Sequence, residues 1–171
     1  MNIQDVILGI LNKKPHSGYE IKQHFEEYFS FFFDASYGTI YPTLSKMEGL
    51  KLITKESVRQ EGKPDKNVFT ITNTGTERFL TYLHGPVEKE VLRSDFFMHL
   101  YFGDMTDRDT VKKMLRQAME EKQTMFDDLE QKLKKLDTKL GTYQKMCMEL
   151  GLAQYAAFIN EIQRVLEHDF A

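Results

Sequence analysis

The chain has 171 residues, of which 41% are hydrophobic and 29% are charged, and this size suits one ordinary domain or two small ones and excludes a large enzyme. A single cysteine excludes an internal disulfide and a multi-cysteine zinc site. The net charge of −3 excludes a globally basic surface, so any contact with nucleic acid must come from a local patch. No apolar run approaches the roughly 20 residues that span a bilayer, and we expect a soluble cytoplasmic protein without membrane contact.

The first half of the sequence begins with two predicted helices. Apolar residues with a helical period run over 3–11, and Lys13-Lys14-Pro15 ends this segment. A second helix follows Ser17, whose spacing to Glu20 is that of a capping box, and we expect it to run to about Phe29.

A third helix and a hairpin come next. Ser36 is placed to cap the helix, Gly49 ends it, and its apolar positions fall on one face: Ile40, Leu44 and Met47. Segments 52–58 and 67–72 are rich in β-branched and aromatic residues, and 61–65 has the composition of a turn. These segments predict a β-hairpin.

The strongest break in the chain follows a fourth helix. Thr74 and Glu77 repeat the spacing of a capping box at the start of this helix. All four prolines lie at or before His84-Gly85-Pro86. We therefore predict an N-terminal domain over 1–85 and a C-terminal domain over 86–171.

The second half shows helix signals only. An aromatic-rich helix is expected from 88 to about 102, a long helix over 108–140 after a cap at Thr106-x-x-Asp109, and a last helix from 143 to about 168. The aromatic helix is apolar on all sides, which predicts burial on several sides.

The long helix carries a coiled-coil-like seam with one defect. Its apolar residues approximate alternating steps of four and three, and Lys122 interrupts them: Val111, Leu115, Ala118, Met125, Leu129, Leu133, Leu136 and Leu140. At about 1.5 Å per residue this helix would be on the order of 50 Å long. It is too long to bury its apolar face against the small first half alone, so a second copy of the chain is the economical partner.

The predicted fold class is mainly α with a small β-hairpin: an N-terminal winged helix-turn-helix followed by a C-terminal dimerisation domain of long helices. In a winged helix the third helix enters the major groove of DNA and the hairpin, or wing, lies along the flanking backbone. The outward positions of the third helix suit contacts with phosphates, sugars and base edges: Thr39, Tyr41, Pro42, Thr43 and Lys46. Pro42 is tolerated there only if the helix begins near Thr39 or bends in its first turns.

Three basic residues surround the hairpin tip, where a wing would meet a groove: Arg59, Lys63 and Lys66. The alternative interpretation is that these are ordinary solvated side chains of a turn. The segment from Gly38 to Lys66 contains six basic and four acidic residues, so its excess of positive charge is small.

The stretch Ala35-Ser36-Tyr37-Gly38-Thr39-Ile40-Tyr41-Pro42-Thr43-Leu44 resembles the PadR family of bacterial transcriptional regulators. Ser17-Gly18-Tyr19-Glu20-Ile21 upstream and Asn67 to Gly75 downstream extend the resemblance over nearly the whole first half. It adds Ser36 and Tyr37 to the candidate DNA contacts. It also implies a homodimer, usually a repressor, whose C-terminal helices dimerise and admit a small effector. Two departures from the family are Asp65 in the wing and the absence of tryptophan.

Other constellations offer little chemistry. Asp95 and His99 share a helix face, but two ligands do not make a metal site, and we predict neither a metal nor a cofactor. Cys147 is interpreted as a small core residue. No phosphate-binding loop or nucleophile motif is present, so we predict that the protein is not an enzyme.

We therefore expect a homodimeric repressor that binds a pseudo-palindromic operator in double-stranded DNA and is released by a small hydrophobic, aromatic or phenolic effector. One alternative is a winged-helix module that binds proteins and never contacts DNA. Another is a ligand-carrying or enzymatic helical dimer.

Overall fold

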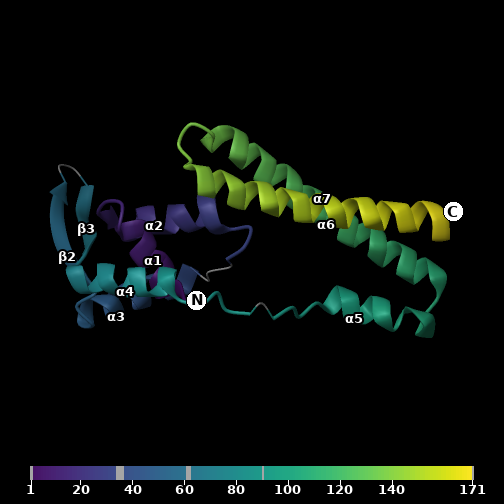
Figure 1. The fold of residues 1–171 in the computed structure, drawn as a ribbon, viewed down its shortest axis with the longest axis horizontal. Coiled ribbons are helices and arrows are strands. Elements are labelled where there is room, and N and C mark those ends of the chain that lie inside the picture. Colours follow the sequence, from purple (N-terminus) through teal and green to yellow (C-terminus); the bar gives the residue numbers. More distant parts are fainter. Residues whose placement is uncertain (1, 34–36, 61–62, 90, 171) are drawn as a thin grey trace. The chain divides into compact units, whose positions relative to one another are not determined.

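Two compact units make up the fold of the chain, Met1–Lys89 and Glu90–Ala171. The computed structural model describes residues 2–33, 37–60, 63–89 and 91–170 (Figure 1). Among the described residues, no helix combines the length and the apolar character needed to cross a bilayer.

The first unit is a winged helix-turn-helix, which confirms the predicted order of helices and hairpin. Its elements are α1 (Ile3–Leu11), β1 (His16–Ser17), α2 (Gly18–His24), a π-helical turn (Phe25–Phe29), a 3-10 turn (Tyr37–Thr39), α3 (Ile40–Gly49), β2 (Ile53–Gln60), β3 (Lys63–Ile71) and α4 (Asn73–His84). The predicted second helix thus divides into an α-helical and a π-helical part.

The sheet has three antiparallel strands in the order β1-β3-β2. Only two residues form β1, where His16 pairs with Phe69 and Ser17 with Val68, and so short a strand leaves no periodic signal in the sequence. The hairpin is longer than predicted, because β2 and β3 stay paired from Ile53 and Ile71 out to Gln60 and Lys63.

The core of the first unit lies where α1, α2 and α3 meet the sheet. Its buried members include the three residues predicted for the inner face of α3. They are Ile7, Leu8, Ile10, Leu11, Ile21, Phe25, Ile40, Leu44, Met47, Leu52, Ile53 and Phe69. Burial of these side chains fixes which face of α3 is left for a ligand.

The second unit consists of α5 (Asp95–Tyr101), a 3-10 turn (Gly103–Met105), α6 (Arg108–Leu136) and α7 (Thr142–Asp169). The two long helices run side by side in opposite directions (Figure 1). The buried residues of their seam include Leu115, Leu129, Leu136, Met148 and Ile162. The predicted seam of α6 is therefore covered in part by α7 of the same chain, while its member Met125 stays 48% exposed.

Lys122, the defect in that seam, lies over two aromatic rings of α7. Its Nζ atom is 5.2 Å from the ring centre of Tyr155 and 6.0 Å from that of Phe158. At these distances a cation is attracted to the ring faces. The lysine thus packs where an apolar residue was expected.

Several predicted boundaries were wrong. The helix expected over 88–102 is confined to Asp95–Tyr101, where the side chain of Ser94 accepts a hydrogen bond from the Phe97 amide. The apolar residues of the predicted helix before Asp95 find little to pack on, since Val91 and Leu92 are 76% and 78% exposed. A short helix is not stable in water without such packing.

The caps of two later helices also differ from the prediction. Thr72, rather than Thr74, accepts from the Gly75 amide at the start of α4. Asp107, rather than Thr106, caps α6. The helix α6 ends at Leu136 instead of Leu140, so the final step of the predicted seam is not helical.

Two predictions of burial in the second unit are not met within the single chain. The aromatic helix α5 is largely exposed, as the fractions for Phe97 (47%), Met98 (53%) and Tyr101 (79%) show. Cys147 is exposed instead of lying in the core.

Candidate nucleic-acid interface

The helix α3 presents a polar face opposite its buried residues. Ile40, Leu44 and Met47 are at most 1% exposed, whereas Tyr41 is 58% exposed. The other outward positions are exposed at Thr39, Pro42 and Lys46 and half-buried at Thr43. Ser45, which was not among the predicted contacts, is exposed as well.

Pro42 lies in the first turn of α3, where a proline is tolerated. The cap of α3 is Thr39, so Pro42 is the third residue of the helix. The first four amides of a helix have no partner within it, and the missing N–H of Pro42 is one of these. The condition that the helix begin near Thr39 is met.

The remaining candidates lie before α3 and in the wing. Ser36 falls outside the described residues; Tyr37 lies in the 3-10 turn before α3 and Lys63 at the start of β3. Arg59 is exposed, and the register of β2 against β3 shifts between Val58 and Gln60. Two positions of β3, between Lys63 and Lys66, thus stand opposite the single position Arg59 of β2, so the extra residue of this bulge lies on β3.

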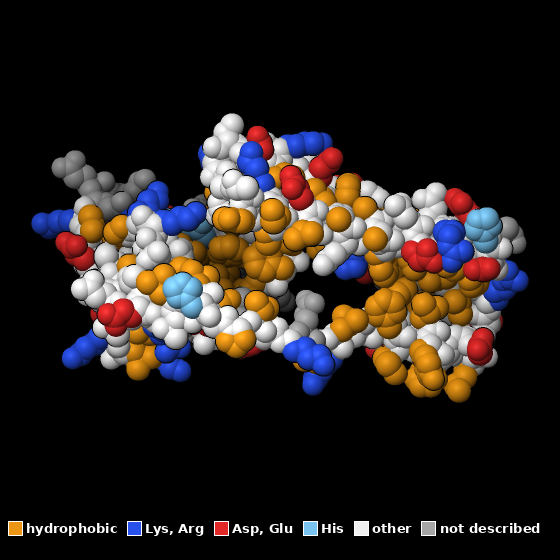
Figure 2. All heavy atoms as spheres, in the orientation of Figure 1, with side chains coloured by type: hydrophobic (Ala, Val, Ile, Leu, Met, Phe, Trp, Pro, Cys, Tyr) orange, Lys and Arg blue, Asp and Glu red, His pale blue; other side chains and the backbone are white. Residues whose placement is uncertain are grey.

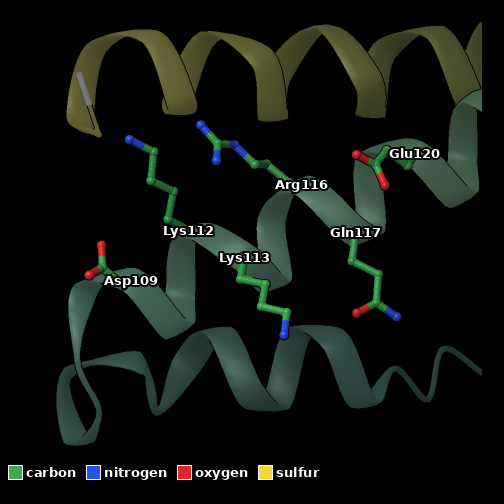
Figure 3. Close-up of a pocket in the computed structure, with 6 residues that line it drawn as sticks. All are labelled: Asp109, Lys112, Lys113, Arg116, Gln117 and Glu120. Atoms are coloured by element: carbon green, nitrogen blue, oxygen red, sulfur yellow. The ribbon is translucent and has the colours of Figure 1, made fainter.

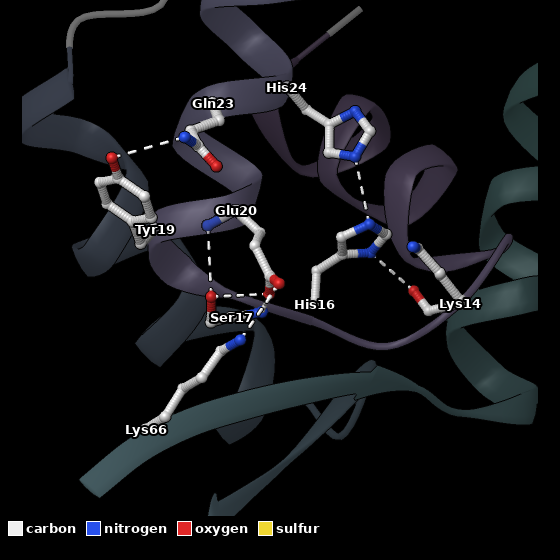
Figure 4. Close-up of polar contacts among 8 residues, drawn as sticks. All are labelled: Lys14, His16, Ser17, Tyr19, Glu20, Gln23, His24 and Lys66. Atoms are coloured by element: carbon white, nitrogen blue, oxygen red, sulfur yellow. Dashed lines mark hydrogen bonds and ion pairs between the residues drawn. The ribbon is translucent and has the colours of Figure 1, made fainter. Parts of the chain in front are cut away.

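Lys66 differs from the other wing residues because it is paired within the chain. Its Nζ atom lies 3.1 Å from Oε1 of Glu20, which is 46 positions away in the sequence (Figure 4). The predicted phosphate contact is thus a residue that links β3 to the start of α2.

The other carboxylate oxygen of Glu20 closes the predicted capping box. Oε2 accepts from the Ser17 amide at 2.7 Å and from the Ser17 hydroxyl at 2.8 Å, and the Glu20 amide donates to Ser17 Oγ. These bonds, with that from Lys66, lower the pKa of Glu20 from 4.5 to about 2. The carboxylate therefore contributes stability above pH 4.5, and this contribution is lost as the pH falls toward 2.

The start of α2 also touches α3. A Cβ atom on Gly18 would lie 2.6 Å from Cε1 of Tyr41, so only a glycine admits the ring of Tyr41 in its present place. Next to it, Tyr19 is 62% exposed and its hydroxyl accepts from Gln23. Tyr19 was not predicted as a candidate contact. Its place two residues after the capping residue Ser17, in the first turn of a helix, could have indicated that it is exposed.

A pair of histidines lies on the far side of the same helix. Nε2 of His16 is 3.1 Å from Nε2 of His24, and Nδ1 of His16 is 2.8 Å from the Lys14 carbonyl (Figure 4). Because the carbonyl can only accept, His16 Nδ1 carries a proton, and His24 then donates to the free Nε2 of His16. Burial and the neighbouring His16 lower the pKa of His24, which favours the neutral form of His24.

The second unit has open grooves along α5 and α6. One of about 470 Å³ is lined by six residues of α6: Asp109, Lys112, Lys113, Arg116, Gln117 and Glu120. Lys112 and Arg116 point toward α7, and Lys113 and Gln117 toward α5 (Figure 3). Lys112 donates to the carbonyl of Phe170, and Arg108 donates to that of Asp169, so part of this positive charge satisfies the carbonyl end of α7.

The metal and thiol candidates do not form sites. His99 and Asp95 are 3.5 Å apart and both exposed. Among the described residues there is no cluster of three or more side chains that would hold a metal ion. Partial burial raises the pKa of the Cys147 thiol, the opposite of what a reactive thiolate needs.

The fold and the site together define a class of protein, the winged helix-turn-helix transcriptional regulators. The defining features are a three-helix unit with a wing, a polar face on the third helix and a following unit of long helices. Comparison with known proteins gives the family. The family model of the transcriptional regulator PadR-like family matches residues 7–80, and that of the virulence activator alpha C-term region matches residues 92–168. This chain belongs to the PadR family, whose members are regulators and not enzymes.

Individual relatives agree with this assignment. The negative transcriptional regulator PadR of Bacillus subtilis strain 168 is 30% identical over 142 residues, which are 82% of this chain and 72% of that protein. A PadR-like transcriptional regulator from Bacillus cereus has a TM-score of 0.87 at 40% identity and covers 96% of this chain and 95% of its own.

The fold is also that of PadR from Bacillus subtilis solved with operator DNA. Its TM-score is 0.85 at 23% identity, covering 96% of each chain. The same protein solved with p-coumaric acid has a TM-score of 0.80 at 22% identity, covering 96% of each chain.

Proposed function

We propose that this PadR-family regulator is a homodimeric repressor that binds a pseudo-palindromic operator, with one α3 helix from each subunit in successive major grooves. In this arrangement the two reading helices are about 34 Å apart. The proposed domain roles are DNA binding for the N-terminal unit and dimerisation for the C-terminal one.

The observation that carries the proposal is the exposed polar face of α3. Burial of Ile40, Leu44 and Met47 orients the helix. The opposite side carries the hydroxyl groups of two threonines and Tyr41 and the ammonium group of Lys46, which the core does not require. Tyr41 would contact the sugar-phosphate backbone, and Lys46 would contact a phosphate. Thr39 and Thr43 would contact the backbone or base edges. No arginine lies on this face, so DNA shape would supply a large share of specificity.

The sites nearest the tip of the wing support the same function. Arg59 is exposed on β2 opposite the bulge of β3, where it would reach a phosphate beside the groove, and Lys63 begins β3. Tyr37 and Ser36 precede α3, where free amides at a helix start bind phosphate well.

The aromatic helix α5 supports the homodimer. Figure 2 shows hydrophobic side chains gathered over this helix. The exposed residues there include Phe97, Met98, Tyr101, Phe102 and Met105, the last of which is 83% exposed. Apolar patches of this kind mark protein interfaces, and a second copy of the chain is the partner that a two-fold symmetric operator requires.

The effector would be a small aromatic compound bound in the second unit. An open groove of about 460 Å³ lies between α5 and α6, and Met98, Phe102 and Met105 are among its lining residues. A second subunit placed over α5 would close it. Bacillus subtilis PadR has been solved with p-coumaric acid, which makes a phenolic acid the first compound to test.

The test of the proposed function is DNA binding by the Lys46→Ala variant. Lys46 is proposed to neutralise one phosphate in each subunit, so its loss should weaken binding to every duplex and reduce the salt slope of log K by about 1 per subunit. We expect the wild-type protein to bind a duplex from upstream of its own gene with steep salt dependence, measured by fluorescence anisotropy at several salt concentrations.

The matched control is Lys134→Ala, which removes an exposed lysine of α6 whose partner is Glu130. We expect this variant to keep the wild-type salt slope. A wild-type protein that shows no salt-dependent binding to DNA would overturn the proposal and favour a protein-binding winged helix. An unchanged slope for Lys46→Ala would remove Lys46 from the interface.

A further inference from the structure

One carboxylate joins the wing to the start of α2, the segment that in turn touches α3. Oε1 of Glu20 is 3.1 Å from Nζ of Lys66 in β3, and Oε2 holds the amide and hydroxyl of Ser17. The side chains of Glu20 and Lys66 are 40% and 34% exposed, so the pair lies at the surface without being fully solvated.

The segment that carries this carboxylate touches both the wing and the reading helix. Ser17 pairs with Val68 in the sheet, two positions from Lys66. Gly18 packs against the ring of Tyr41 on α3. The start of α2 is therefore a place where a shift of β3 would be transmitted to α3, in addition to the direct ion pair between Lys55 of β2 and Glu48 of α3 at 3.7 Å.

We propose that Glu20 is a positioning residue for DNA binding, which holds the wing at a fixed angle to α3 through Lys66. Lys66 then acts within the protein and does not neutralise a phosphate. The inference rests on the proposed function, because it names what aligns the two DNA-binding parts of that same site.

Electrostatics alone gives the opposite expectation for Glu20. A carboxylate beside a DNA-binding surface repels the phosphates, so its removal should strengthen binding. If Glu20 positions the wing, its removal weakens binding although the protein becomes less acidic. The sign of the change thus separates the two roles.

The experiment compares Glu20→Gln with Glu56→Gln. Glutamine at position 20 can still serve in a capping box, so the start of α2 is kept and the ion pair is lost. Glu56 is exposed on β2, where it pairs in register with Val68, and its replacement removes the same charge without touching Lys66. Binding is measured with the upstream duplex and with a scrambled duplex of equal length.

We expect Glu20→Gln to weaken binding to both duplexes by roughly threefold to thirtyfold, the range of couplings transmitted through a contact network. Glu56→Gln should bind as tightly as the wild-type protein or more tightly. Binding by Glu20→Gln that is equal to or tighter than wild type would overturn the inference.

Lys66→Gln provides a second readout. If Lys66 serves only to hold Glu20, the variant weakens binding as Glu20→Gln does, keeps the wild-type salt slope, and adds nothing in the double variant. A salt slope reduced by about 1 per subunit would instead show a phosphate contact and overturn the assignment of Lys66.

A measurement without DNA separates failure of this inference from failure of the proposed function. Loss of the pair should accelerate amide hydrogen exchange in β2 and β3 while α1 and α4 keep their protection. Unchanged exchange in the wing overturns the inference. Accelerated exchange in a protein that binds neither duplex overturns the proposed function and leaves no DNA-binding role for Glu20.

Discussion

At the scale of residues, two glycines of the first unit have neighbours of different kinds. A Cβ atom on Gly18 would meet the ring of Tyr41, which is 58% exposed and free to turn toward solvent. On Gly75 it would lie 2.2 Å from the backbone oxygen of Leu52, which cannot move without the strand. The absence of a side chain at Gly18 therefore leaves room for Tyr41, which is proposed to contact DNA. The absence of a side chain at Gly75 leaves room for the backbone of Leu52, on which the fold depends.

Replacement of these glycines should separate function from stability. We expect Gly18→Ala to change the free energy of unfolding by less than about 1 kcal/mol, because only an exposed ring must move. Its affinity for DNA should fall roughly tenfold, the loss of one good contact. Urea unfolding and anisotropy titration measure the two quantities.

Gly75→Ala is the contrasting variant. It should lose about 1–3 kcal/mol or more of stability, since an overpacked site forces backbone shifts. A Gly18→Ala protein with wild-type affinity would show that Tyr41 need not hold its present position.

At the scale of elements, the apolar side chains of α5 and α6 differ in what covers them. Three residues of the α6 seam, Leu115, Leu129 and Leu136, are buried, and Lys122 lies over the rings of Tyr155 and Phe158 at its one polar position. The helix α5 has less cover: Phe96 stacks on α7, with its ring centre 5.5 Å from that of Phe158, whereas Phe97, Met98 and Tyr101 are 47%, 53% and 79% exposed. The exposed apolar side chains of α5 are available to a second subunit.

The double change Phe97→Asp, Tyr101→Asp should therefore dissociate the dimer. Buried aromatic side chains dominate interface energies, and two carboxylates in their place would be desolvated without partners. We expect a dimer for the wild-type protein and a monomer of unchanged helix content for the variant, as measured by sedimentation and circular dichroism.

Leu83→Asp on α4, at a side chain that is 56% exposed, is the control and should stay dimeric. A double variant that still sediments as a dimer would place the interface elsewhere. A monomeric wild-type protein would contradict the proposed homodimer itself.

At the scale of the whole molecule, regulation requires that a ligand in the second unit change the DNA affinity of the first. A ligand shifts such an equilibrium only through different affinities for the two states, and the coupling is reciprocal. The groove beside Met98, Phe102 and Met105 is the place proposed for the ligand. A ligand-induced change in the separation of the two α3 helices, away from the spacing of the major grooves, would then lower the affinity for DNA.

We expect p-coumaric acid to weaken binding to the upstream duplex. By reciprocity, the duplex should weaken binding of the acid by the same factor. Calorimetric titration of the acid, with and without DNA, measures both sides of this cycle. Release without a matching loss in the acid's affinity would contradict coupling between sites, and absence of any release would exclude this acid as the effector.

The elements of the first unit were predictable because their signals are local. The capping box of Ser17 and Glu20, the spacing of Ile40, Leu44 and Met47, and the β-branched strands each determine a short segment, and together they give the winged-helix order. The outward face of α3 follows from the same spacing. The DNA contacts proposed for that face and for the wing stay predictions.

Properties that depend on distant partners could not be obtained from local signals. The strand β1 exists only because β3 lies beside it, and α5 is short because the apolar residues before it find little to pack on. Cys147 lies on an apolar stretch and is nevertheless exposed.

The sequence by itself determined a winged helix, a polar outward face on its third helix and a second unit of long helices, since periodicity and capping act over a few residues. Only the tertiary structure decided the pairing of Lys66. Its position near the hairpin tip suggests a phosphate contact, but folding brings it to Glu20, 46 positions away. The physical reason is that a charge takes its partner from what lies within a few ångströms, and chain proximity does not determine that neighbourhood.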